Sequence, residues 1–210
     1  QKIGEHDIVY LLSHHDPDDF HCTDVRVIDQ QEAAATCFAS GTKVTLIKRR
    51  KFRVDDREVP IYVSIRKKPP EAKVLKLLRK NEKNPAVAVD DELGLMAVLN
   101  SVADVKTFQN HLTRSTSKAN SFMVLEDISD TLSGDRSYHS TATGSSSKTP
   151  MIKFFARLGG MRVEFIIHTN RSWLNYMYQK DVAHDEYEVR RLFDSGVAEL
   201  LFPADIFHLD

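Results

Sequence analysis

The sequence has few cysteines and no long apolar run. Of its 210 residues, Cys22 and Cys37 are the two cysteines, too few for a disulfide framework, so we expect a reducing, cytoplasmic setting. No apolar stretch approaches the roughly 18 residues that a transmembrane helix needs, so no membrane partner is expected. Neither sign of charge dominates, because 29 Lys and Arg stand against 30 Asp and Glu. This balance argues against a uniformly basic nucleic-acid-binding protein and leaves a local basic patch open.

The remaining composition is that of a folded domain, with 41% hydrophobic and 28% charged residues. A chain of this length has the size of one domain, which we expect to span residues 1–210. Residues 1–40 are expected to form a helical and loop lead, with a short strand or helix at 8–12 and a helix over 30–40. Residues 41–210 are expected to form the core.

Apolar patterns predict strands and helices in mixed order within residues 41–210. Strands are predicted over 44–54 and 59–65, joined as a hairpin by an acidic turn, and over 86–89, 94–99, 151–158, 162–168 and 200–202. Helices are predicted over 71–80, 104–112 and 181–193, and a Ser/Thr/Gly-rich loop over 129–150. The order of these elements predicts an α+β domain with a mixed β-sheet flanked by helices.

Basic residues gather where the second predicted strand leads into helix 71–80. Arg66 and Lys68 follow the strand, and Lys76 and Arg79 lie on the helix. Positive charge concentrated in this way suits a polyphosphate. A solvated helix face would have the same composition.

Two acidic positions are candidates for metal binding. Asp91 follows a short apolar strand beside Gly94, a common way to present a Mg²⁺ ligand to a phosphate, although it also suits an ordinary turn. Glu164 alternates with apolar neighbours on strand 162–168, where a carboxylate is costly unless it has a partner, a metal or solvent.

A loop aromatic and a basic hairpin extend the set of candidates. Tyr138 lies in the Ser/Gly-rich loop, where an aromatic ring can stack on a nucleobase or fold onto the core. Residues 48–53 carry several Lys and Arg, which could follow an RNA backbone or form a solvated strand face.

Taken in order, these features resemble the nucleotidyltransferase domain of the RelA/SpoT alarmone synthetases over about residues 44–191. The family's motifs Arg-x-Lys, Asp-x-x-Gly-x-Arg, Gly-Tyr-x-Ser-x-His, Glu-x-Gln-x-Arg-Thr and His-x-x-Tyr are similar to residues 66–68, 91–96, 137–142, 164–169 and 184–187. The family also has a Ser on the helix that follows Arg-x-Lys, and this sequence has Ala72 there. Within the motifs, Met96 and His168 replace Arg, Ala142 replaces His and Ile166 replaces Gln.

The resemblance implies an ATP-dependent pyrophosphokinase that transfers pyrophosphate to the 3′-hydroxyl of a guanosine or adenosine nucleotide or of tRNA. It implies Mg²⁺ as cofactor and leaves a homo-oligomer open. It assigns Asp91 and Glu164 to catalysis and to the metal, and Arg66, Lys68, Lys76 and Arg79 to ATP. It assigns Tyr138, Ser140, His168 and His184 to the acceptor.

Two other functions stay open at this point. The departures at Met96, Ile166 and His168 favour a catalytically degenerate nucleotide-binding regulatory module on the same fold. A nucleotidyltransferase that moves AMP in place of pyrophosphate is disfavoured by family analogy alone.

Overall fold

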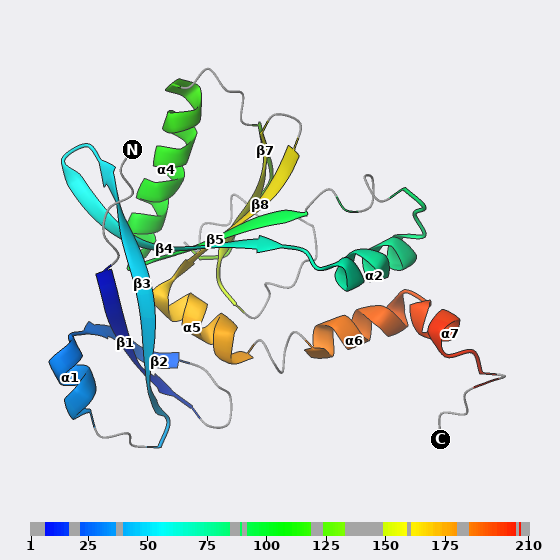
Figure 1. Cartoon of the computed structure of the whole chain (residues 1–210), viewed down its shortest axis with the longest axis horizontal. Coiled ribbons are helices and arrows are strands. Elements are labelled where there is room, and N and C mark those ends of the chain that lie inside the picture. Colours follow the sequence, from blue (N-terminus) through cyan, green and yellow to red (C-terminus); the bar gives the residue numbers. More distant parts are fainter. Residues whose placement is uncertain are drawn as a thin grey trace.

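The computed structural model describes residues 7–16, 22–36, 40–84, 89, 92–118, 124–132, 149–158, 161–179, 185–204 and 206. Within these residues, an eight-stranded sheet runs in the order β2-β1-β3-β4-β5-β8-β7-β6 (Figure 1). The strands are β1 Asp7–His15, β2 Cys22–Ile28, β3 Thr42–Val54, β4 Arg57–Lys67, β5 Leu93–Leu99, β6 Val124–Asp130, β7 Ile152–Leu158 and β8 Met161–Thr169. The helices are α1 Gln30–Ala35, α2 Pro70–Lys80, α4 Val102–Lys118, α5 Asn170–Gln179, α6 Asp185–Asp194 and α7 Val197–Leu201.

The sheet is mixed because β5 and β8 are parallel, whereas the other neighbouring strands pair antiparallel. The parallel pair requires a long connection, which contains α4, β6 and β7. Helices cover both faces of the sheet. The predicted α+β class with a mixed sheet flanked by helices is therefore confirmed.

Two cores lie on opposite faces of the sheet. On one face, Val105 and Phe108 of α4 pack with Ala97 and Leu99 of β5. On the other, α5 packs with Val98, the residue between them. Neighbouring residues of a strand point to opposite faces, so α4 and α5 cover different sides.

Both predicted hairpins form. Val54 pairs with Arg57 across a two-residue turn in which Asp55 adopts a φ of 52°, and Leu158 pairs with Met161. The strand at 94–99 and the helix at 71–80 also form, each one residue longer, and the helix at 104–112 forms within the longer α4, Val102–Lys118.

The expectation of a helical and loop lead is wrong for most of residues 7–15 and for 22–28, although the strand alternative at 8–12 is confirmed as part of β1. Residues 7–15 form β1 and residues 22–28 form β2, and β1 pairs with β2 on one side and with β3 on the other. Much of this segment is polar, so its pattern resembles a loop, and strand pairing stabilises it. The helix expected over 30–40 is shorter, because Thr36 is already extended at the end of α1.

The end of the chain also differs from expectation. The strand predicted over 200–202 is wrong, since Leu200 and Leu201 belong to α7 and Phe202 follows its end. Helix α5 was not predicted. The helix expected over 181–193 is α6, which begins at Asp185. The strand predicted over 86–89 lies outside the described residues except for Val89. Most of the loop predicted over 129–150 also lies outside them, and the first two residues of that loop belong to β6.

None of the described helices is long and apolar enough to cross a membrane.

Candidate functional site

Glu164 of β8 is a buried carboxylate held between a cation from the neighbouring strand β7 and one from β4, two strands away on the other side. Its side chain is 7% exposed. Arg66 Nη2 donates to Oε2 at 2.7 Å, and Lys153 Nζ lies 2.9 Å from Oε1. Each oxygen therefore has its own charged partner, which excludes a surface-facing Glu and offsets the cost of burying a carboxylate.

The sheet register brings these side chains together. Arg66 of β4 pairs with Gly94 of β5, and Gly94 pairs with Glu164 of β8, so the three residues form one row across the sheet. A Cβ at position 94 would lie 3.4 Å from Arg66 Nε. The Arg66 guanidinium therefore crosses β5 directly over Gly94, at the distance of an ordinary van der Waals contact with an added Cβ. Gly94 was expected beside the metal ligand Asp91, which lies outside the described residues, and in the structure Gly94 is the residue that the Arg66 side chain crosses.

Lys153 is a site residue that the sequence reasoning missed. It pairs with Ile166, two residues from Glu164, and strand neighbours on this diagonal are within reach of a long side chain. The signal was present, because Lys153 is the first charged residue in the apolar strand Ile152–Leu158. Beside it, Phe155 lies directly opposite Glu164, with Arg162 Cζ 3.7 Å from the centre of its ring.

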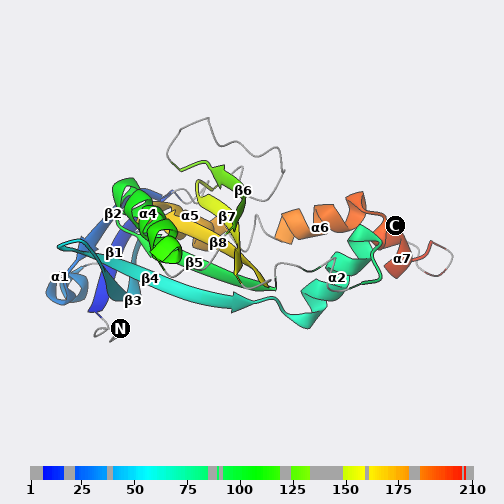
Figure 2. The same cartoon turned by 90° about the horizontal axis from the view of Figure 1, so that it is seen from above.

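A second cluster of charges lies beyond Arg66 along the chain. Figure 2 shows the end of β4 leading into α2, where this cluster lies. Lys73 Nζ lies 2.5 Å and Lys67 Nζ 3.6 Å from Glu92 Oε1. The hydrogen bond from Lys73 is the main cause that lowers the pKa of Glu92. Among the described residues of the two clusters, cations outnumber carboxylates, which favours the binding of an anion there.

The remaining predicted site residues fall into two groups. Lys68 lies beside Glu92, whose carbonyl accepts a hydrogen bond from the Lys68 N–H at 2.9 Å, and Lys76 and Arg79 are partly buried on α2. Asp91, Tyr138, Ser140 and His184 lie outside the described residues.

His168 was expected to contact the acceptor, but the structure places it in the core. It is fully buried, its Nδ1 lies 3.2 Å from Ser172 Oγ, and its ring stacks on Tyr176 with the centroids 5.5 Å apart. It lies four residues along β8 from Glu164, at the end covered by α5. The structure therefore removes His168 from the acceptor-binding set. Met96, where the family has Arg, likewise packs against the core beneath α5.

Burial of His168 gives a testable dependence of stability on pH. Desolvation lowers its pKa from 6.5 to about 4, partly offset by the backbone of Pro150. The unfolded chain therefore binds a proton that the folded chain rejects, so stability is complete above the unfolded pKa and is lost as pH falls towards 4. At about pH 5 we expect this group to cost about 2 kcal/mol relative to about pH 8.

Urea unfolding at the two pH values measures this effect. His168→Gln should lose about 2 kcal/mol less than the wild type between them. His14→Gln, at a half-exposed histidine, should keep the wild-type loss. An identical loss in all three proteins would contradict the assignment.

A Mg²⁺ ion does not fit the described residues by themselves. Glu164 is the one predicted ligand among them, and both of its oxygens already contact cations. No three His, Cys, Asp or Glu side chains gather as a metal site in the part of the chain that the structure describes. A divalent ion here would meet two like charges, so the predicted Mg²⁺ site is not formed by these residues.

Comparisons with known proteins return partial likenesses to solved structures. No family model matches the sequence, and no curated protein matches it. Among solved structures, small alarmone synthetase 1 from Bacillus subtilis is 17% identical, with a TM-score of 0.45 over 67% of this chain and 74% of that one. That synthetase bound to its product pppGpp is 16% identical, with a TM-score of 0.41 over 67% and 73%. A GTP pyrophosphokinase family protein from Streptococcus pneumoniae is 21% identical, with a TM-score of 0.38 over 67% and 70%. With TM-scores below 0.5, these likenesses define neither the activity nor the substrate of this chain.

Proposed function

We propose that this chain is an ATP-dependent pyrophosphokinase of the RelA/SpoT type. The observation that carries the proposal is the contact of Arg66 with Glu164 across Gly94. These residues come from three of the motifs that resemble the family, and 98 positions separate the first from the last. Two segments so far apart in the sequence meet at one end of the sheet, as a shared site requires.

In this proposal, the basic end of the sheet binds the triphosphate of ATP, which enters as its complex with Mg²⁺. Arg66 and Lys153 turn from Glu164 towards the phosphates, since a polyphosphate carries more negative charge than one carboxylate. Each cation that turns leaves an oxygen of Glu164 free to accept a proton. Lys76 and Arg79 of α2 supply further positive charge.

The reaction then transfers a pyrophosphoryl group. Glu164 accepts the proton of the acceptor's 3′-hydroxyl while that oxygen attacks the β-phosphorus of ATP. The bond between the β-phosphorus and the oxygen bridging it to the α-phosphorus breaks, and AMP leaves with that oxygen. Positioning and charge neutralisation supply most of the acceleration in phosphoryl transfer.

The basic hairpin, residues 48–53, favours a nucleotide over tRNA as the acceptor, because its charges are less available to RNA than the sequence suggested. Arg49 is 1% exposed, which corrects both earlier interpretations of this residue, as an RNA contact and as part of a solvated face. Lys51 pairs with Asp7 at 3.2 Å and with Glu58 at 3.7 Å, and Arg53 pairs with Asp56 at 3.6 Å. Acidic residues thus neutralise part of this surface, which weakens its attraction for a phosphate backbone.

A degenerate nucleotide-binding module is the second candidate. It is favoured by His168, which is buried in the core, and by Met96, which packs against the core, at two positions where the family has arginine. It predicts that ATP binds at the basic end of the sheet and is not turned over.

An assay with ATP labelled at the γ-phosphate separates these candidates. The protein is incubated with labelled ATP and Mg²⁺, with GDP, GTP, ATP or bulk tRNA offered separately as acceptor. We expect label on a nucleotide acceptor together with AMP. Release of labelled pyrophosphate would indicate AMP transfer, and binding of ATP with no product would indicate the degenerate module. Label on tRNA would overturn the choice of a nucleotide acceptor.

A further inference from the structure

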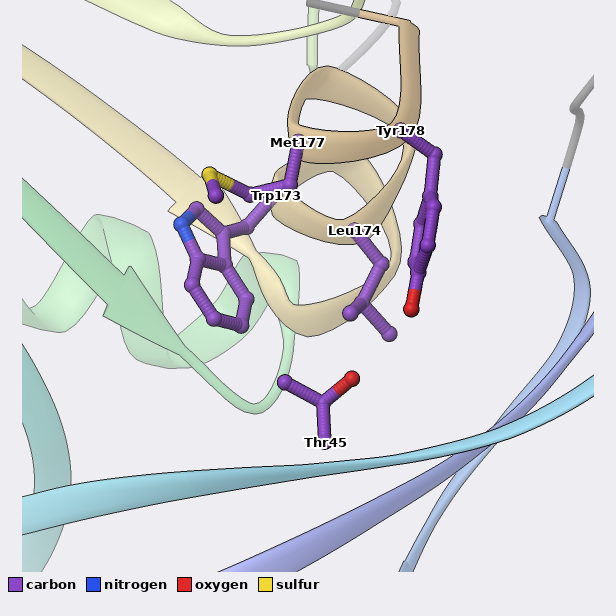
Figure 3. Close-up of a pocket in the computed structure, with 5 residues that line it drawn as sticks. All are labelled: Thr45, Trp173, Leu174, Met177 and Tyr178. Atoms are coloured by element: carbon purple, nitrogen blue, oxygen red, sulfur yellow. The ribbon is translucent and has the colours of Figure 1, made fainter.

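Helix α5 covers only part of the sheet face that carries Glu164. Figure 3 shows Trp173 and Leu174 extending from α5 toward β3, and both residues belong to the core that includes Val98 of β5. Glu164 pairs with the β5 residue four positions before Val98, so it lies on the same face and away from these contacts. Phe155 of β7 lies directly opposite Glu164 and is half-buried. An aromatic ring therefore borders the candidate site where α5 does not cover it.

Two cations lie over the ring of Phe155. Arg162 Cζ is 3.7 Å and Lys153 Nζ is 5.3 Å from the centre of the ring. Both distances fall within the roughly 6 Å over which a cation is attracted to an aromatic face. The Lys153 Nζ also lies 2.9 Å from Glu164 Oε1, so one ammonium group contacts a carboxylate and a ring at the same time.

The two cations differ in how firmly they are held. The Arg162 side chain is 13% exposed and is paired with carboxylates of β6, among them Asp127 at 2.6 Å from its Nη2. Its charge is thus neutralised in place, and its guanidinium restrains the ring on which it is stacked. The Lys153 side chain is 27% exposed, and its carboxylate partner is Glu164. The ring is therefore the second contact of Lys153, and it stays in position if Lys153 leaves Glu164.

We propose that Phe155 is a positioning residue for Lys153, whose ammonium group it retains while Lys153 passes from Glu164 to a phosphate of ATP. This inference rests on the proposed function, because ATP is taken as the anion that Lys153 reaches. A ring that restricts the side chain before ATP binds reduces the conformational entropy lost on binding. Leucine at position 155 fills similar space but does not attract a cation. We therefore expect Phe155→Leu to weaken the binding of ATP about threefold to fivefold.

Calorimetry with α,β-methylene ATP and Mg²⁺ measures this affinity without turnover. Phe155→Tyr keeps the ring and should bind as the wild type does. Phe52→Leu is the matched control, because Phe52 is also half-buried but packs on Phe108 of α4, on the other face of the sheet. In a Lys153→Met background, Phe155→Leu should have no further effect. The same loss of affinity in both backgrounds, or no loss in either, would overturn the proposal.

A nuclear magnetic resonance measurement tests the contact between ring and ammonium in the absence of ATP. Lysines are converted to ¹³C-dimethyl-lysine, which keeps the charge, and Lys153→Met identifies the signal of Lys153 by its loss. The ring current should shift this signal upfield in the wild type and in Phe155→Tyr but not in Phe155→Leu. An unshifted signal in the wild type overturns the proposal.

The two measurements together separate this inference from the proposed function. A shifted Lys153 signal in a protein that does not bind the ATP analogue would mean that the proposed function fails and that Phe155 is only a structural partner of Lys153. Binding of the analogue with equal affinity by the wild type and Phe155→Leu would overturn the positioning role alone. Circular dichroism confirms that each variant folds, and Phe155→Met replaces Phe155→Leu if that variant does not.

Discussion

Glu164→Gln should lower the rate of pyrophosphate transfer by about a thousandfold, the scale of losing one preorganised electrostatic group at a transition state. The amide is nearly the same size as the carboxylate, but it cannot accept the proton of the acceptor's hydroxyl. It also loses the charge that holds Arg66 and Lys153 in place. The labelled-ATP assay measures the rate, and urea unfolding confirms that the fold persists.

Glu126→Gln is the matched control. Glu126 also contacts two cations, Arg157 at 3.1 Å and Arg162 at 2.8 Å, but it lies on β6 and takes no part in the proposed chemistry. Its activity should remain within about twofold of the wild type, as for a surface substitution away from a site. Equal activity in the two variants would show that Glu164 is merely a structural ion-pair partner.

Lys153→Met extends the same prediction to the residue that the sequence reasoning missed. If Lys153 binds phosphate, its loss should raise the KM for ATP by about tenfold or more, because a charge-assisted contact contributes about 1.5–3 kcal/mol. The remaining partner of Glu164 is then Arg66. An unchanged KM would remove Lys153 from the ATP site.

Arg49→Ala should lower the free energy of unfolding by about 3 kcal/mol, because it removes a buried, hydrogen-bonded group and leaves a cavity. The guanidinium donates to the amide oxygens of Asn100, just after β5, and Asn170, at the start of α5. Burial lowers the pKa of Arg49 to about 10, partly offset by the charge of Asp104. The side chain thus joins β3 to the residues that directly follow the two parallel strands, Asn100 after β5 and Asn170 after β8.

Urea unfolding of neighbouring variants isolates this contribution. Arg50→Ala removes an exposed arginine at the next position and should change stability by less than about 0.5 kcal/mol. Arg49→Met keeps most of the volume and loses the donors, so it should lie between the two. If Arg49→Ala is as stable as Arg50→Ala, the two amide contacts contribute nothing.

The sequence by itself determined the local elements of the central sheet. Alternation and turn residues were enough for the hairpins β3–β4 and β7–β8, because a hairpin pairs neighbouring segments and its turn specifies the register. Helix α2 was predictable because Pro70 begins it and its apolar residues recur at helical spacing. The motif positions Arg66, Gly94 and Glu164 were also available, because their residue types and order carry the resemblance.

Only the tertiary structure decided which side chains share a site. The partners of Glu164 depend on the register between β4, β5, β8 and β7, and no local pattern encodes pairing over such distances. His168 and Arg49 looked like surface or ligand-binding residues, and their burial follows from the packing of α5 on the sheet. Strand β2 and the full length of β1 were missed for the same reason, because their polar sequences are stabilised by pairing within the sheet and by the core beneath α5. Local chemistry set the candidates, and long-range pairing selected among them.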